Sequence, residues 1–527
     1  MGKLKEESIK KATLIMMSTI LLSRLLGFVR EMLIASMFGR SYVTDAFFAA
    51  FSIPDLMFYL LVGGALNSGF MPVFNTEKAK GNEEGAWKAA STFLTVSILF
   101  IIAFNIFGIV FAPWLMPLVA NGIGKNPVTF ALAVKLTRIM FTAVSFTVLA
   151  GLLGGILNSY KIFSIPSLGP VLYNVGIIAG AVLLSKSFGI YGLAVGVVIG
   201  ALANFGIMVP SFRKVGKMFR FRLDIHDPLY QRMLLLMGPA MVGLSFSQVN
   251  LVVNQNIASM LSEGTITALR YANRIILLPL GIFASSVAIA IFPTLNSLIG
   301  QNEMEKYKNT LFKGLQSILF ITIPSSIGLI VLNVPIVRLL FRTGKFTESD
   351  VAITAYALAF YSIGVIGQSA VQVVTRAYYS LQDTMTPVKV GGAMVLANLI
   401  LNLAFLKVSN LAIGGIALSY TITSILNVVI LYRILEKKLN GLNTSGIMVS
   451  IIKSSAASAV MGVAAYFTTH YIEAALGTAS KLMQLIEVGS GIAVGALVFF
   501  AVAYLLKMQE MSYAMDMVMK KFKKSAA

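Results

Sequence analysis

Apolar runs of roughly 20 residues recur from one end of this chain to the other, and each is long enough to cross about 30 Å of hydrocarbon as a helix. Counting these runs gives about fourteen spans. Only 12% of the residues are charged, whereas a typical soluble domain has about 25%. The sequence therefore predicts an all-α integral membrane protein and excludes a soluble globular one.

The residues needed for several kinds of catalysis are missing from the sequence. The chain has no cysteine, and its two histidines, His226 and His470, lie far apart in or beside loops. Disulfides, thiolate metal sites and cysteine nucleophiles are excluded, and two histidines far apart in the sequence argue against histidine-based catalysis as the function. We therefore expect no catalytic residues, no metal site and no cofactor.

The formal net charge is +21, and clusters of Lys and Arg lie in the N-terminal tail, the loop 213–232 and the tail 508–527. An even number of spans puts these segments on one side of the membrane, and the positive-inside rule makes that side cytoplasmic. Both termini are thus predicted to be cytoplasmic. Basic segments beside spans are typical of contact with anionic membrane lipids, so nucleic acid is not the expected partner.

The chain also repeats itself. Ile34 begins the tetrapeptide IASM, which recurs at Ile257, and Thr44 matches Thr267, both at an offset of 223 residues. Three later matches have an offset of 221: Pro72 with Pro293, Ser159 with Ser380, and Pro166 with Pro387. Since each repeat holds six spans, the two halves have parallel orientation, which is a transporter architecture with its site expected between the halves.

The repeat and the charged segments together predict five parts of the chain. They are a first six-helix lobe at 1–212, a basic cytoplasmic linker at 213–232, a second six-helix lobe at 233–438, an additional helix pair at 439–507 and a basic cytoplasmic tail at 508–527.

Charged residues inside spans mark the candidate site, because each costs about 2.5–3.5 kcal/mol at the centre of a membrane helix. They include Arg24, Arg30 and Glu31 in the first span, Asp45 and Asp55 in the second, and Arg270 and Arg274 in the eighth. Arg30 and Arg274 each lie eight residues inside the outer end of their span, at a depth of about 12 Å. They therefore occupy one level in opposite repeats.

These arginines favour an internal cationic cavity for an anionic substrate, since a guanidinium matches phosphate oxygens and stays charged. The alternative is that each arginine locks helices together or reaches an interface. An ion pair between Arg24 and Asp55 fits their similar depth.

Two further patterns in the spans favour structural roles. Gly192, Gly196 and Gly200 have the four-residue spacing that lets helices approach closely. Asn398 and Asn402, one turn apart, form a possible cation site through their oxygens, but hydrogen bonding between helices is the favoured interpretation.

Several motifs carry a family resemblance. The stretch SRLLGFVREMLIASMFG is followed by TDAFFAAFSIP and GGALNSGFMPVF, and later come YANRIILLPLG and RAYYSLQDTMTPVKV. These motifs resemble the MurJ (MviN) family, whose members are lipid II flippases of the bacterial cell envelope within the multidrug/oligosaccharidyl-lipid/polysaccharide exporter superfamily. The similarity covers nearly the whole chain.

The resemblance implies a function and its residues. The substrate would be lipid II, an undecaprenyl-diphosphate-linked peptidoglycan precursor, moved to the outer leaflet of the bacterial inner membrane by alternating access. The family's cavity arginines fall on Arg24, Arg30 and Arg274, and its acidic residue in the TDAF motif falls on Asp45. The additional helix pair would form a groove for the lipid tail. Cell-wall synthesis enzymes are a candidate class of partner.

The chain departs from the family pattern at one point. Some family members bind sodium through carboxylates in the seventh and eleventh spans, where this chain has Asn254, Asn398 and Asn402. Sodium coupling is therefore not expected here.

Other functions fit less well. One alternative is a flippase for another polyprenyl-linked glycan or a multidrug exporter of the same superfamily. A membrane-embedded glycosyl- or phosphotransferase is another, but it needs paired carboxylates for a metal-bound diphosphate. We expect no such pair at a membrane surface.

Overall fold

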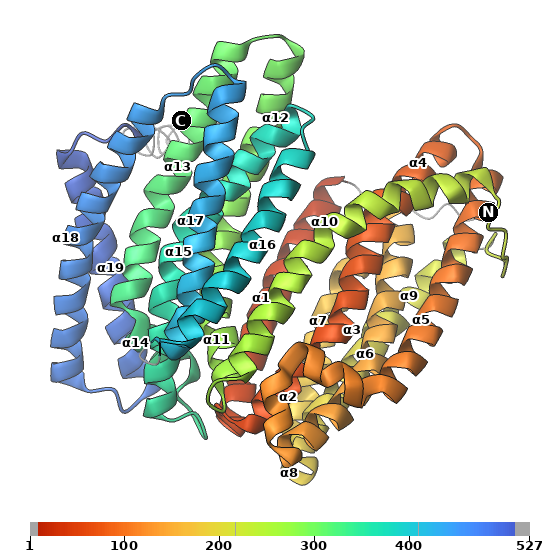
Figure 1. Cartoon of the computed structure of the whole chain (residues 1–527), viewed down its shortest axis with the longest axis horizontal. Helices are drawn as coiled ribbons and strands as arrows, with labels where there is room; N and C mark the ends of the chain where they lie inside the picture. Colours follow the sequence, from red (N-terminus) through yellow and green to blue (C-terminus); the bar gives the residue numbers. More distant parts are fainter. Residues whose placement is uncertain (1–8, 217, 409–410, 512–527) are drawn as a thin grey trace. The chain divides into compact units, whose positions relative to one another are not determined.

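The structure is a computed structural model that describes residues 9–216, 218–408 and 411–511, and in these residues it is helical without a strand (Figure 1). The helices pack into two compact units, 1–267 and 268–527. The helices of the first unit are α1 (Ile9–Phe38), α2 (Tyr42–Ala49), α3 (Ser52–Phe58), α4 (Met71–Ala79), α5 (Glu83–Ala120), α6 (Pro127–Ser159), α7 (Ser164–Ala179), α8 (Ser185–Phe188), α9 (Ile190–Val215) and α10 (Pro228–Ser259).

Helix α11 (Thr265–Pro279) starts at the boundary between the units and continues into the second. The remaining helices are α12 (Ser285–Gly300), α13 (Met304–Val331), α14 (Asn333–Phe341), α15 (Glu348–Ser380), α16 (Met385–Leu406), α17 (Ala412–Lys438), α18 (Thr444–Leu476) and α19 (Lys481–Leu505). Much of the predicted tail 508–527, and Lys3 and Lys5 of the N-terminal tail, fall outside the described residues.

Twelve helical segments of the described chain are long and apolar enough to cross a membrane. Helices α1 and α10, with 30 and 32 residues, have the length as well but carry charged and amide side chains. Together these segments account for the fourteen predicted spans, so the predicted fold class is confirmed. In the first unit α10 packs against α5 and against the segment Tyr59–Phe70 of the second span.

Close packing of α7 on α9 depends on glycine. A Cβ atom added to Gly180 would lie 2.4 Å from the Cα of Gly196, and one added to Gly176 would lie 2.4 Å from the Cα of Gly200. Such distances leave no room for any side chain, so the two backbones touch directly. The prediction that the glycines of the sixth span serve helix packing is confirmed.

We expect Gly196→Leu to separate α7 from α9 and to lower the stability of the protein by about 1–3 kcal/mol, the usual cost of overpacking. Gly206→Leu is the matched control, because it lies on the same helix and a Cβ atom added there would have no described atom within 4 Å. Thermal unfolding in detergent measures both. Equal melting temperatures for the two variants would contradict the packing role.

Three spans of the described chain contain stretches of π-helix: η1 (Tyr59–Phe70), η3 (Gly180–Leu184) and η4 (Leu280–Ala284). The first and the last occupy corresponding positions of the second and eighth spans, given the offset of the repeat. In η1 the Asn67 side chain donates a hydrogen bond to the carbonyl of Val62 at 3.0 Å. The repeat is therefore visible in backbone irregularity as well as in sequence.

In the second unit α15 packs on α13 and α17, and the additional pair α18–α19 is attached through α13 (Figure 1). Buried side chains of Phe320, Ala457, Met461 and Phe499 form the hydrophobic core of this attachment. The rings of Phe320 and Phe499 lie 5.1 Å apart. The pair is thus an integral part of this unit, held by apolar contacts along its length.

Candidate substrate-binding site

Arg30 is held in place by two partners in the first unit. Its guanidinium donates to Oδ1 of Asn174 at 3.1 Å and to Oε1 of Glu31 at 2.7 Å. Asn174, on α7, in turn donates to the carbonyls of Ser23 at 3.2 Å and Pro170 at 2.9 Å. Because the Arg30 side chain remains 16% exposed, it is oriented by the protein and still accessible to a ligand.

Arg24 is exposed on the same helix, whereas Asp55 is half-buried in α3. No ion pair of the described residues joins Arg24 to Asp55, and the Asp55 charge acts electrostatically on Arg30. The structure therefore places Asp55 in the surroundings of Arg30 and not in the expected pair with Arg24.

Asp45 is buried and accepts hydrogen bonds from the turn that begins α11. Its Oδ2 accepts from the backbone N–H of Gly264 at 2.6 Å, and its Oδ1 accepts from the N–H and hydroxyl of Thr267 at 2.9 and 2.7 Å. A carboxylate at a helix N-terminus satisfies amides that the helix leaves unpaired. Both oxygens of Asp45 are thus engaged by protein groups.

Residues related by the repeat meet beside Asp45. The Thr267 and Thr44 hydroxyl oxygens lie 2.9 Å apart, and Arg40 donates to the carbonyl of Glu263 at 2.6 Å. Both pairs have the repeat offset of 223 residues. The internal repeat is therefore visible in the hydrogen bonds beside Asp45.

In the second unit Arg270 and Arg274 are half-buried and lie one turn apart on α11. Between them Tyr271 is fully buried and stacks on Phe341 at a centroid distance of 4.5 Å. The stacking fixes the rotation of α11 on α14. Because residues four apart share a helix face, Arg270 and Arg274 lie on one side of α11.

The three asparagines of the possible cation site form hydrogen bonds within their own helices. In α10, Nδ2 of Asn254 donates to Oδ1 of Asn250 at 2.9 Å. In α16, Nδ2 of Asn402 donates to Oδ1 of Asn398 at 3.0 Å, with both residues buried. The described residues contain no group of three or more carboxylate, histidine or cysteine side chains that could hold a metal ion.

One expectation about carboxylates was wrong. Asp224 and Asp227 have the DxxD spacing in the loop between α9 and α10. Arg222 binds Oδ2 of Asp224 at 2.6 Å and holds the pKa of that carboxyl below its usual value. Asp227 caps α10 by accepting from the N–H groups of Leu229 and Tyr230 at 2.8 and 3.1 Å. Both carboxylates thus have structural partners in the loop.

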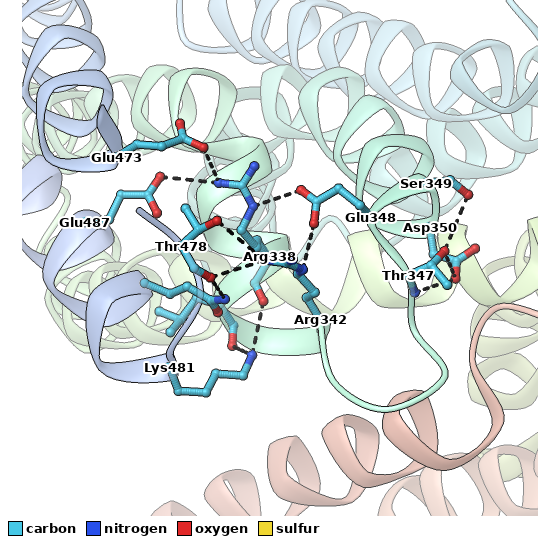
Figure 2. Close-up of polar contacts among 12 residues, drawn as sticks. Arg338, Arg342, Thr347, Glu348, Ser349, Asp350, Glu473, Thr478, Lys481 and Glu487 are labelled. Carbon is cyan, nitrogen blue, oxygen red and sulfur yellow. Dashed lines mark hydrogen bonds and ion pairs between the residues drawn. The ribbon is translucent and has the colours of Figure 1, made fainter. Parts of the chain in front are cut away.

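Sequence reasoning missed a second charged cluster, at the end of α14 (Figure 2). Figure 2 shows Glu473 and Glu487 on one side of Arg338 and Glu348 on the other. Arg338 lies 2.9 Å from Glu348, 2.9 Å from Glu473 and 3.7 Å from Glu487. Glu473 and Glu487 lie far from Arg338 in the sequence, and the docking of α18–α19 brings them to it. Glu348 is only ten residues from Arg338. Two charged residues in the sequence could have indicated this cluster: Glu487 inside the α19 span and Glu473 near the end of α18.

The fold and the arginines within its spans define a multi-pass membrane transporter built from a repeated six-helix unit. The family described as lipid II flippase MurJ matches residues 34–487. The chain belongs to this family.

Similar proteins agree with this assignment. The lipid II flippase MurJ of Burkholderia cenocepacia is 32% identical over 81% of this chain and 84% of its own length. A probable lipid II flippase MurJ of Bdellovibrio bacteriovorus is 29% identical over 97% of both chains. A solved structure of a lipid II flippase MurJ in the inward closed conformation has a TM-score of 0.78 at 29% identity and covers 94% of this chain and 99% of that chain.

The wider fold is shared with drug transporters. An inward-facing multidrug resistance MATE family transporter of the MOP superfamily has a TM-score of 0.68 at 13% identity, over 81% of this chain and 98% of that chain. This likeness concerns the arrangement of the helices alone.

Proposed function

We propose that this chain is the lipid II flippase of a bacterial inner membrane and that it moves its substrate to the outer leaflet by alternating access. The observation that carries the proposal is the family match over residues 34–487. A chain of this family is a transporter and not an enzyme. Its activity belongs to peptidoglycan synthesis, and so to cell-wall biogenesis and cell shape.

The arginines are the proposed ligands of the substrate's diphosphate. Arg30 is the principal one, because Glu31 and Asn174 fix its planar group at the moderate exposure that a phosphate can reach. Arg24 and Arg274 supply further positive charge, with Arg270 at the outer edge. Asp55 balances this charge, and Asp45 acts by holding the α2–α11 junction together.

Complementation tests this function. The chain, produced in a bacterium depleted of its own lipid II flippase, should restore growth and should restore the fraction of lipid II that is accessible at the outer surface. If the chain restores neither growth nor lipid II exposure and changes only the resistance of the cells to drugs, the result would instead favour the multidrug exporter.

The additional helix pair is the proposed path of the lipid tail. An apolar pocket of about 300 Å³ lies between α13 and α18, lined by Ile327, Val331, Ala459, Gly462, Val463, Tyr466 and Phe467. A prenyl chain gains about 0.8 kcal/mol for every CH₂ group buried from water. A groove of this kind suits a long hydrocarbon that cannot enter a polar cavity.

Filling this groove should discriminate between lipids by tail length. Ala459→Phe places a ring in the groove and is expected to weaken binding of the full-length lipid by about tenfold, the equivalent of two CH₂ groups. A short-chain analogue with the same headgroup should bind unchanged. Ala456→Phe, an exposed position of α18 outside the groove, is the control. Equal losses for both ligands would argue against a tail path.

Transport is proposed to be independent of sodium and to use the membrane potential. Neutral amides at Asn254, Asn398 and Asn402 offer no negative ligand to a sodium ion. An inside-negative potential favours outward movement of a substrate by about 2.3 kcal/mol per negative charge per 100 mV. Flipping rates in proteoliposomes should therefore follow the imposed potential and stay constant when sodium replaces potassium. A steep sodium dependence at fixed potential would contradict this expectation.

Both termini are proposed to be cytoplasmic, with the loop between α9 and α10 resting on anionic lipid headgroups. In this loop Phe221, Leu223 and Ile225 are exposed at alternate positions, next to Arg220 and Arg222. Exposed apolar side chains flanked by basic ones are typical of a membrane interface. Cell-wall synthesis enzymes stay a candidate class of partner.

A further inference from the structure

A pocket of about 450 Å³ opens beside the Arg338 cluster. It is lined by Arg342, Thr343, Gly344, Phe346, Thr347 and Glu348 of the α14–α15 connection and by Ala479, Lys481 and Gln484 at the start of α19. By the predicted topology this is the outer end of the unit. The volume is within the usual range for ligand pockets.

The pocket contains a cation that no acid of the described residues neutralises. Nζ of Lys481 donates to the carbonyls of Arg338 at 3.2 Å and Leu339 at 2.6 Å (Figure 2). The nearby carboxylate of Glu348 is held instead by Arg338 and Arg342, at 2.9 and 2.8 Å. An ammonium has three donors, and two of those of Lys481 are used. The N-terminus of the 25-residue helix α19 adds partial positive charge at the same place.

The pocket also contains a buried acceptor. Gln484 is 3% exposed, and its Nε2 donates to the carbonyl of Thr478 at 2.9 Å. Its Oε1 is buried and has no hydrogen-bond partner in the described part of the chain. A buried polar atom without a partner is unfavourable, so a ligand that donates to this oxygen binds more tightly than one that does not.

The surroundings of the pocket are apolar and exposed. On α19, Leu482 is 67% exposed and Leu485 is 56% exposed. On a membrane helix such side chains face acyl chains. A ligand in the pocket is therefore adjacent to lipid.

We propose that this pocket binds the headgroup of an outer-leaflet phospholipid whose phosphate is followed by a hydrogen-bond donor, as in the ethanolamine and glycerol headgroups. Lys481 and Arg342 bind the phosphate, and Oε1 of Gln484 and the Glu348 carboxylate accept from the donor. This site is separate from the proposed transport path, and its occupant is a resident lipid rather than the substrate.

Native mass spectrometry of the full chain in detergent tests the proposal, with phospholipids of identical acyl chains and different headgroups. Phosphatidylethanolamine and phosphatidylglycerol should bind at least about tenfold more tightly than phosphatidylcholine, which has no donor. Equal affinity for the three lipids overturns the proposal. Retention of inorganic phosphate with the same dependence on Lys481 would mean a general anion site and also overturns it.

Three variants and one control locate the binding. Lys481→Gln and Gln484→Met should each weaken phosphatidylethanolamine binding about tenfold. Ala479→Phe, at an exposed position of the rim, should block the pocket without touching a polar group. Lys186→Gln removes the same charge from a predicted outer loop of the first unit and should change nothing. Wild-type affinity in Ala479→Phe overturns the proposal.

The test is independent of transport. Lipid binding is measured without lipid II, so a failure to flip lipid II leaves this result unaffected. Displacement of phosphatidylethanolamine by lipid II at equal concentration would assign the pocket to the transport path and overturn its role as a separate site.

Discussion

Replacing Arg30 with Ala is expected to abolish complementation of a flippase-depleted bacterium. The change removes a guanidinium that two partners hold ready for a phosphate, and charge-assisted hydrogen bonds contribute about 1.5–3 kcal/mol each. Loss of two such bonds would weaken lipid II binding by roughly a hundredfold or more. Growth and binding of labelled lipid II to purified protein are the measurements.

The variant must be separated from a folding defect, because Glu31 is only 2% exposed and would lose its ion pair with Arg30. A double variant, Arg30→Ala with Glu31→Gln, removes the buried charge as well and should restore stability without restoring activity. Arg138→Ala removes an exposed arginine of α6 and is the matched control. Full activity of the double variant would show that Arg30 serves only to neutralise Glu31.

Arg338→Met is expected to be among the most destabilising single changes in the second unit. It leaves Glu487, which is fully buried, without its only cation among the described residues. Removing one partner of a buried ion pair costs about 3–5 kcal/mol. The melting temperature in detergent should fall steeply, and α18–α19 should become sensitive to proteolysis.

A second change tests the cause. Adding Glu487→Leu to Arg338→Met should recover much of the loss, because a buried ion pair replaced by apolar groups is often tolerated. Arg433→Met breaks the ion pair with Glu436 at 3.1 Å, in which the arginine is 66% exposed, and should cost little. No recovery in the Arg338–Glu487 double variant would mean that Arg338 acts through Glu348 and Glu473 instead.

The spans and the repeat were predictable because membrane crossing demands long apolar runs, which leave a signal in every span. The attachment of α10 to η1 and α5 was not predictable. This attachment depends on complementary side-chain shapes, such as Met233 and Met237 against Gly69. A hydropathy pattern does not show which apolar faces pack against each other.

The charged residues of the candidate site were predictable from the sequence, but the residues to which they form hydrogen bonds were not. Counting residues from the outer ends of the spans identified Arg30 and Arg274 as candidates. The hydrogen bond between Arg30 and Asn174 was not predictable in this way, because it joins residues 144 apart in the sequence. Asp45 shows the same limit, since its hydrogen bonds run to a turn 219–222 residues away. A charge inside a span is costly, so it predicts that the residue has a partner. The sequence does not identify that partner.

The matched π stretches η1 and η4 have a consequence for movement. A π-helix holds extra residues in each turn relative to an α-helix. Rewinding one such stretch by a single residue would turn everything that follows it by about 100° around the helix axis. The second and eighth spans would thus turn different side chains toward the interior by rotation about their own axes.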